Sequence, residues 1–290
     1  MTEPPIYQGL AGLADAYDGF IIDLWGVMHD GVQAFPEAVD CLGQLRAAGK
    51  RVAILSNAPR RGHAVVARNV ELGIAEELAD LTLSSGEVTW QHLQQRPDEW
   101  YRSLGPRCFQ LGPGRDLNMR ESLDYHFVED IEAADFILLT GSLDPSHRVE
   151  DYADLLAPAL AADKPLICAN PDLEVIRGGK REICAGAIAV YYEDQGGRVR
   201  SHGKPDRQIY EACLDGLGNP ERRRVAAVGD SLRTDIAGAL GAGLDGIFVA
   251  DGIHGEELGT GPDGPDPAAL AALLEERGIW PTATLPRLRW

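Results

Sequence analysis

The stretch IIDLWGVMHDG, residues 21–31, places an aspartate directly after two isoleucines and a tryptophan two positions further on. A short aliphatic run of this kind is typical of a strand that is buried on both faces of a parallel sheet. Ligands of open α/β sheets bind beyond the carboxyl ends of such strands, so Asp23 is a candidate nucleophile or metal ligand. A turn-capping aspartate is the structural alternative for the same residue.

The same pattern recurs along the chain. Aliphatic runs of about strand length lie at residues 19–25, 51–57, 135–141, 165–170, 224–230 and 246–250. Helical patterns occupy residues 36–50 and 206–218, between some of these runs. Strands that alternate with amphipathic helices predict an α/β fold, Rossmann-like, with a parallel sheet covered on both faces. Asp23, Ser56 and Asp230 would then lie at one edge of this sheet.

Length and composition restrict the class of protein. The chain has 290 residues, 44% of them hydrophobic, which favours two domains. Residues 85–200 have strand and helix candidates of their own, so they are predicted to form an inserted α/β domain between two core segments, 1–84 and 201–290. At the end of the chain, Pro267 and Gly278 bracket an Ala/Leu-rich helix.

The charge balance limits the partners. A formal net charge of -18 argues against nucleic acid, which proteins bind through clustered Lys and Arg. A small phosphorylated ligand stays open, because a few local cations or a metal ion outweigh a distant negative surface.

Targeting and redox signals are absent from the sequence. The five cysteines include no CxxC pair, so we expect buried thiols rather than a disulfide framework or a zinc site. Without a signal peptide or a long apolar run, neither export nor membrane insertion is expected, and a cytoplasmic location is predicted. A homo-oligomer is left open.

The other predicted strand ends supply a set of residues that would act together. They are Ser56 and Asn57, Lys204 in a GKP turn, and Asp230 and Asp235 in GDSLRTD. A carboxylate that attacks phosphorus forms an aspartyl phosphate, and further carboxylates hold the Mg²⁺ that offsets charge repulsion. A lysine and a hydroxyl would bind the phosphoryl oxygens.

The order strand-Asp, strand-Ser, Lys, GDxxxxD resembles the four motifs of the haloacid dehalogenase superfamily of phosphohydrolases. The insertion, GKPDRQIY and GDSLRTDIAGALGAGL resemble the class IIA, NagD-like branch with an α/β cap of the C2 type. The resemblance implies that Asp23 is the nucleophile, that Ser56 binds the phosphoryl group and that Lys204 neutralises its charge. It also implies that Mg²⁺ is held by Asp23, Asp230 and Asp235, the last directly or through water.

Trp25 departs from the family pattern. The family has a second Asp at this position, which serves as general acid and then as general base, and indole can do neither. The Trp25 backbone carbonyl could still be a metal ligand, as the resemblance implies. His29 or Asp30 could substitute for the acid, although His29 is also interpretable as a solvent-facing turn residue. The Trp25 ring itself could exclude water from the site or pack against an aromatic substrate, or it could have only a structural packing role.

Weaker signals concern substrate binding. Asn57 is a candidate substrate ligand, as are Asn170 and Asp172 in ANPD, which resembles a cap loop near the core site but is also ordinary turn chemistry. Arg60, Arg61 and Arg233 could hold an anion, but solvated charges are the simpler interpretation. We interpret RGGKR (177–181) as a basic turn and LGPGRD (111–116) as a strand-ending turn, because neither has the spacing of a nucleotide loop.

Two functional hypotheses follow. The first is a Mg²⁺-dependent phosphohydrolase of a small phosphorylated metabolite, with sugar phosphates as the class that the resemblance favours. The second is a catalytically weak or inactive phospholigand-binding protein that keeps the fold and the metal site.

Overall fold

A six-stranded parallel sheet forms the core of the computed structural model, which describes residues 3–261 and 264–290. Its strand order is β13-β12-β11-β1-β2-β3, and every neighbouring pair is parallel. The strands are β1 (Gly19–Ile22), β2 (Arg51–Ser56), β3 (Leu81–Ser84), β11 (Val225–Gly229), β12 (Asp245–Val249) and β13 (Ala283–Leu285). The predicted α/β fold with a parallel sheet is confirmed.

Alternating side chains of this sheet pack on opposite faces. Phe20 and Ile22 belong to the cluster that includes Leu42 of α2 (Pro36–Ala47). Ile21, between them, packs with α8 (Arg207–Gly216) and α9 (Ala237–Gly241) on the other face. The period of two in a strand sends neighbouring residues to opposite faces, which is why the strand must be apolar throughout.

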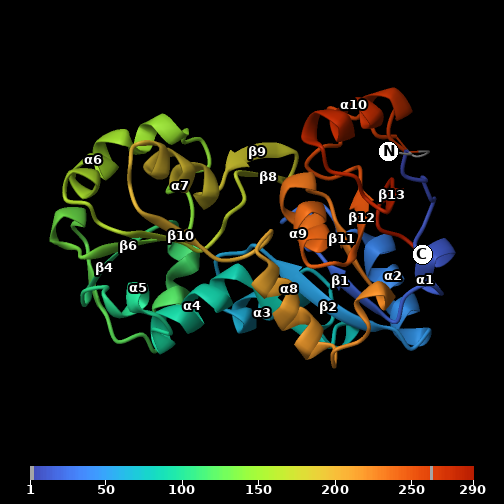
Figure 1. Cartoon of the computed structure of the whole chain (residues 1–290), viewed down its shortest axis with the longest axis horizontal. Coiled ribbons are helices and arrows are strands. Elements are labelled where there is room, and N and C mark those ends of the chain that lie inside the picture. The colour runs from blue at the N-terminus through green and yellow to red at the C-terminus, as the bar shows by residue number, and fades with distance from the viewer. Residues whose placement is uncertain (1–2, 262–263) are drawn as a thin grey trace.

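A second parallel sheet is built from the middle of the chain and occupies the other lobe in Figure 1. Its order is β10-β7-β6-β4-β5. The strands are β4 (Arg107–Leu111), β5 (His126–Val128), β6 (Phe136–Leu139), β7 (Leu166–Cys168) and β10 (Val199–Ser201). The boundaries 85 and 200 for the insertion stay a prediction, although strands with an independent sheet lie between them.

Helices cover both sheets. Besides α2, α8 and α9, these helices are α1 (Ala11–Ala14), α3 (Gly62–Glu71), α4 (Ser85–Gln95), α5 (Glu99–Arg102), α6 (Ala153–Ala161), α7 (Ala185–Asp194) and α10 (Pro267–Arg277). As predicted, α10 begins with Pro267 and ends at Gly278, which is in the left-handed conformation with φ 65°. Gly238 lets α9 pack closely on α8, since a Cβ there would lie 2.5 Å from the Tyr210 ring.

An antiparallel hairpin, β8 (Glu174–Arg177) and β9 (Lys180–Ile183), lies at the junction of the two lobes (Figure 1). Gly178 and Gly179 form its turn with φ of 52° and 77°, which matches the left-handed pair that tight hairpins require. The interpretation of RGGKR as a basic turn is therefore confirmed. LGPGRD is likewise the turn that ends β4.

All five cysteines are buried free thiols, as predicted. None of the helices in the described part of the chain is both long and apolar enough to cross a membrane.

His202 follows β10 where the chain returns to the core, and it is buried as a neutral ring. Its Nε2 is hydrogen-bonded to the Tyr101 hydroxyl, and its ring stacks on His92 with 4.1 Å between centroids. Burial, with a smaller contribution from the nearby His92, lowers the pKa of His202 to about 3. A histidine that stays neutral in the fold but takes up a proton when unfolded destabilises the fold in acid.

The folded pKa of His202 is depressed, so its contribution to stability is complete above the unfolded pKa of about 6.5 and is lost as pH falls below it. We predict that the difference in unfolding free energy between wild type and His202→Gln shrinks by about 2 kcal/mol between pH 6.5 and 5. Urea denaturation at each pH measures this difference. The exposed His63→Gln is the control and should show no such trend. A difference that is constant with pH would contradict the buried neutral state.

Candidate active site

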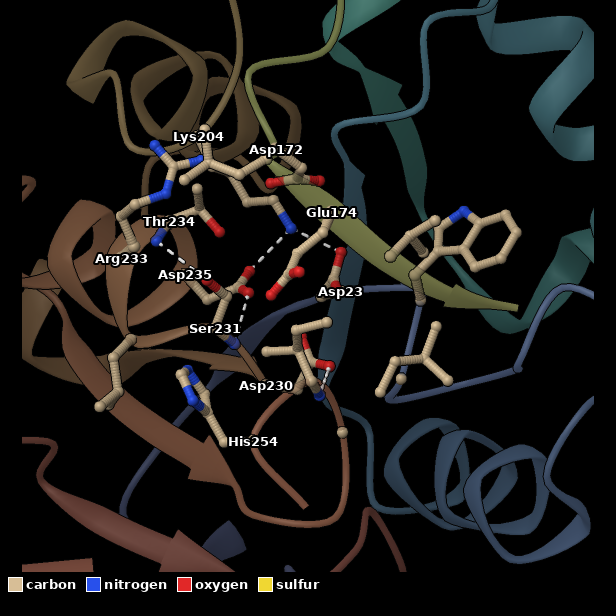
Figure 2. A pocket seen from close by; sticks show the side chains of 18 of the residues that line it. Asp23, Asp172, Glu174, Lys204, Asp230, Ser231, Arg233, Thr234, Asp235 and His254 are labelled. Atoms are coloured by element: carbon tan, nitrogen blue, oxygen red, sulfur yellow. Dashed lines mark hydrogen bonds and ion pairs between the residues drawn. The ribbon is translucent and has the colours of Figure 1, made fainter. Parts of the chain in front are cut away.

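Three buried carboxylates meet at the carboxyl edge of the core sheet. Asp23 directly follows β1, Asp230 directly follows β11, and Asp235 lies in the single π-helical turn Leu232–Ile236. One oxygen from each lies within 4.8 Å of the others, and all three residues are 7% exposed or less. Figure 2 shows the three carboxylates facing one common space. Parallel strands β1 and β11 are neighbours, so their adjacent ends bring residues 23 and 230 together.

Lys204 reaches into this group from the segment that leaves the second sheet. Its Nζ donates to Asp23 Oδ1 at 2.5 Å and to Asp235 Oδ1 at 2.7 Å (Figure 2). Burial alone would lower the pKa of Lys204, but the Asp23, Asp235 and Asp172 carboxylates outweigh it and raise the pKa well above its usual value. Lys204 is therefore a fixed positive charge.

Asp230 is framed by two close glycines. A Cβ on Gly26 or on Gly252 would lie 2.0 Å from its Oδ2, and Gly26 also has a left-handed φ of 73°. The Ile253 amide donates to the same oxygen at 2.7 Å. Only glycine fits at these two positions, so backbone packing fixes the direction of the Asp230 carboxylate.

The donor set fits a divalent cation. Burial raises the pKa of Asp23 to about 7, against the opposing effect of Lys204, and burial also raises the pKa of Asp230 well above its usual range, with Asp23 and Asp235 adding to it. One lysine cannot balance the charge of three buried carboxylates. A hard divalent cation among them would remove the remaining cost of burying negative charge. Within the described residues, the Trp25 carbonyl oxygen accepts no hydrogen bond and stays open to serve as a ligand.

Asn57 ties the lysine segment to the loop 169–172. Its Oδ1 accepts from the Lys204 amide at 2.8 Å, and its Nδ2 donates to Asp172 Oδ1 at 2.8 Å. Asn170 Oδ1 in turn accepts from the Asp172 amide at 3.0 Å, which is ordinary Asx-turn geometry. Burial raises the pKa of Asp172. The side-chain amide of Asn57 is thus already engaged, and we infer a positioning role for it.

Ser56 ends β2 and is fully buried. Its Oγ accepts from the Ala58 amide at 3.2 Å. Ser56 lines neither of the two cavities described below. Unlike Lys204, it therefore does not join the cluster of buried carboxylates.

The segment after Asp23 folds back on itself. The amides of Met28 and His29 both donate to the Leu24 carbonyl, and the Trp25 and His29 rings meet edge to face at 4.9 Å. His29 is 3% exposed, so its interpretation as a solvent-facing turn residue is wrong. Asp30 Oδ1 accepts from the amides of Val32 and Gln33, which caps the turn.

The arginines after Ser56 hold the two lobes together. Arg60 pairs with Asp116 at 2.9 Å, and Arg61 pairs with Glu87 at 2.8 Å while lying over the Trp90 ring. Both side chains are 20% exposed or less, so solvated charge is the wrong interpretation for them. Arg233 is exposed and donates to the Pro171 carbonyl.

Two cavities adjoin the site. The first, about 500 Å³, is lined by Asp23, Lys204, Asp230 and Asp235, and the second is about 340 Å³. Trp25, Asp172 and Val175 line both.

Two residues of the hairpin were not predicted for the site. Glu174 of β8 points into the first cavity (Figure 2), and the Arg177 guanidinium lies 4.8 Å from the centre of the Trp25 ring. No motif marks either residue, because only tertiary packing brings β8 over the end of β1.

Comparison with known proteins identifies this arrangement. A haloacid dehalogenase-like hydrolase model matches residues 20–126, and a HAD-hydrolase-like model matches residues 201–276. A crystal structure of a haloacid dehalogenase-like hydrolase from Brucella suis 1330 is 34% identical, covers 97% of this chain and 99% of its own, and superposes with a TM-score of 0.83. The chain belongs to the haloacid dehalogenase-like family.

Relatives of lower sequence identity narrow the assignment to one branch of the family. A 4-nitrophenylphosphatase of Schizosaccharomyces pombe is 26% identical, over 87% of this chain and 89% of its own length. Ribonucleotide monophosphatase NagD of Escherichia coli is 26% identical, over 80% and 87%. The predicted class IIA, NagD-like resemblance is confirmed.

Removal of Asp230 should abolish metal binding. A ligand present at 100 times its dissociation constant stabilises a fold by about 2.7 kcal/mol, which for a chain of this size is a Tm rise of roughly 5–10 °C. We predict such a rise with Mg²⁺ for wild type and little or none for Asp230→Asn, whose amide can still accept from Ile253. The helix-surface variant Asp40→Asn should keep the full rise. An unchanged Mg²⁺ response in Asp230→Asn would place the cation elsewhere.

Proposed function

We propose that the protein is a Mg²⁺-dependent phosphohydrolase that forms an aspartyl phosphate at Asp23, with a small, sugar phosphate-like metabolite as substrate. One observation carries the proposal: Asp23 shares a buried cluster with Lys204, Asp230 and Asp235 at the carboxyl edge of the core sheet. The relatives whose names describe phosphatases support the reaction class.

The proposed reaction has two displacements at phosphorus. An Asp23 oxygen bonds to phosphorus while the bond from phosphorus to the substrate oxygen breaks, and the leaving oxygen departs as an anion that takes a proton from solvent. Water then attacks the same phosphorus and gives up a proton to solvent, the bond to Asp23 breaks, and inorganic phosphate is released. A bound Mg²⁺ would neutralise phosphoryl charge and orient the transferred group.

Lys204 contributes to the proposed reaction through its positive charge. Lys204 favours the ionised form of Asp23 that the attack needs, although burial opposes it. Its fixed positive charge also opposes the repulsion between Asp23 and an incoming phosphoryl group. Asn57 holds the Lys204 backbone, so the charge is in place before substrate arrives.

Neither Trp25 nor His29 is a ready proton donor for the leaving group. The Trp25 indole cannot serve as acid, and burial lowers the pKa of His29 to about 4, which leaves the ring neutral at pH 7. General acid catalysis contributes on the order of 100- to 10,000-fold in rate. Substrates whose leaving group needs no proton should therefore react best.

A catalytically weak phospholigand-binding protein is the second candidate, and Trp25 is the observation that favours it. The cluster of Asp23, Lys204 and Asp235 favours the enzyme, since phosphate binding alone does not need a carboxylate facing a metal site. The cytoplasmic location and a homo-oligomer stay predictions from the sequence.

Phosphate release with Mg²⁺ tests the proposal on an aryl phosphate, an acyl phosphate, sugar phosphates and nucleotides. We predict activity in wild type and in Asp40→Asn, and a loss of at least about 1,000-fold in Asp23→Asn, because the amide cannot act as nucleophile. Equal rates in wild type and Asp23→Asn would exclude the proposed nucleophile. No release from any substrate, with Mg²⁺ and phosphate still bound, would favour the binding protein.

The dependence on the leaving group is a separate prediction. Because the Trp25 indole cannot protonate the leaving oxygen, kcat on aryl phosphate should exceed kcat on an alkyl phosphate by roughly 100-fold or more. The series of substituted phenyl phosphates should show a steep dependence of log kcat on the pKa of the phenol. A flat dependence would mean that another group protonates the leaving oxygen.

A further inference from the structure

The second cavity, of about 340 Å³, has no part in the reaction steps above. It lies beyond Trp25 and Asp172, which separate it from the cavity that holds Asp23. It is lined by the core loop after Ser56, by the 3₁₀ segment Gly114–Arg120 and by the hairpin. Because Trp25, Asp172 and Val175 line both cavities, the two are adjacent, and the alcohol part of a substrate bound at Asp23 would have to pass between these side chains to reach the second.

Arg115 is an exposed residue that lines this cavity without an ion-pair partner among the described residues. The charged residues of the lining are Arg60, Arg68, Arg115, Arg177, Asp116, Asp172 and Glu182. Arg60 pairs with Asp116, Arg177 with Glu182, and Arg68 with Glu71 outside the cavity. Within residues 3–261 and 264–290, the Arg115 side chain forms neither an ion pair nor a hydrogen bond.

His29 provides a second unpartnered group. The Gly31 amide donates to His29 Nδ1 at 3.1 Å, so the ring proton is on Nε2. His29 lines the cavity and is 97% buried, yet its Nε2 has no partner among the described residues and is not sealed off from the cavity. Because this N–H stays accessible from the cavity, it can donate to a ligand or to water there.

Part of the remaining wall is apolar, although Asn57, Asn69 and Thr140 also line it. The Trp25 ring is held between His29 and the Arg177 guanidinium. Leu24, Val65 and Ile183 add apolar surface. A few directed donors in a largely apolar cavity are typical of a small-molecule subsite.

We infer that this cavity is a subsite for a second anionic group on the substrate, which the Arg115 guanidinium pairs with and His29 Nε2–H donates to. The substrate class is thus a phosphate monoester whose alcohol part carries a carboxylate or a second phosphate. This inference rests on the proposed function, because it assumes that the phosphoryl group sits at Asp23. A guanidinium matches both anions through its planar fork of donors.

The net negative charge of the chain limits where a small anion can bind. With 45 acidic and 27 basic residues, the protein repels anions in general. A small anion would be held only where cations dominate locally, and the charged lining of this cavity has four arginines and three acids.

Calorimetry with phosphonates tests the subsite without turnover, because the C–P bond is not hydrolysed. The probes are 3-phosphonopropionate, propane-1,3-bisphosphonate and propylphosphonate, each with the full chain and Mg²⁺. We expect wild type to bind at least one of the doubly anionic probes about tenfold more tightly than propylphosphonate. This ratio should fall close to one in Arg115→Gln and be kept in Arg223→Gln, an exposed arginine away from both cavities.

The outcomes separate the two proposals. A preference confined to the carboxylate probe, or to the bisphosphonate, identifies which anion the subsite takes. Equal affinity for all three probes in wild type, or an unchanged ratio in Arg115→Gln, overturns the subsite and leaves phosphate release as an independent result. An affinity ratio that depends on Arg115 in a protein that releases no phosphate would uphold the subsite and reject the phosphohydrolase.

Discussion

The contact of the Lys204 ammonium with two buried carboxylates is the interaction on which the site depends. Three acidic side chains that are nearly excluded from water would repel one another, and burial would drive them to the neutral form. Lys204 offsets only part of this charge. The cluster is therefore unfavourable by itself and suited to take up a divalent cation, whose charge would also offset the charge of a bound phosphoryl group.

Sheet topology explains how residues so distant in sequence meet. Asp23 and Asp230 are 207 positions apart, yet β1 and β11 are neighbouring parallel strands whose carboxyl ends coincide. Lys204 arrives on the segment that returns from the second sheet, and Asn57 hydrogen-bonds its backbone at the end of β2. The hairpin then covers the site, with Arg177 on the Trp25 ring and the Gly178 amide donating to the Asp30 carbonyl.

Much of this was predictable from the sequence, for identifiable reasons. Aliphatic runs such as residues 51–56 must be buried on both faces, which predicts a parallel sheet, and polar residues at their ends share an edge. The short strand β13 and the hairpin were missed, since neither has a distinctive pattern. The orientation of His29 was wrong, because its burial depends on how the chain folds after Trp25. Arg115 and Arg177 lie in stretches that were interpreted only as turns, and Glu174 has no motif, since the place of all three depends on packing between lobes.

The central claim is that Asp23 becomes phosphorylated. Its most direct test is to mix the protein with an aryl phosphate and Mg²⁺, quench in acid within the first turnovers, and map phosphorylated peptides by mass spectrometry. The account predicts a hydroxylamine-sensitive phosphate on Asp23, absent from Asp23→Asn. Phosphate release without a phosphorylated carboxylate, or with the phosphate on another residue, would contradict it.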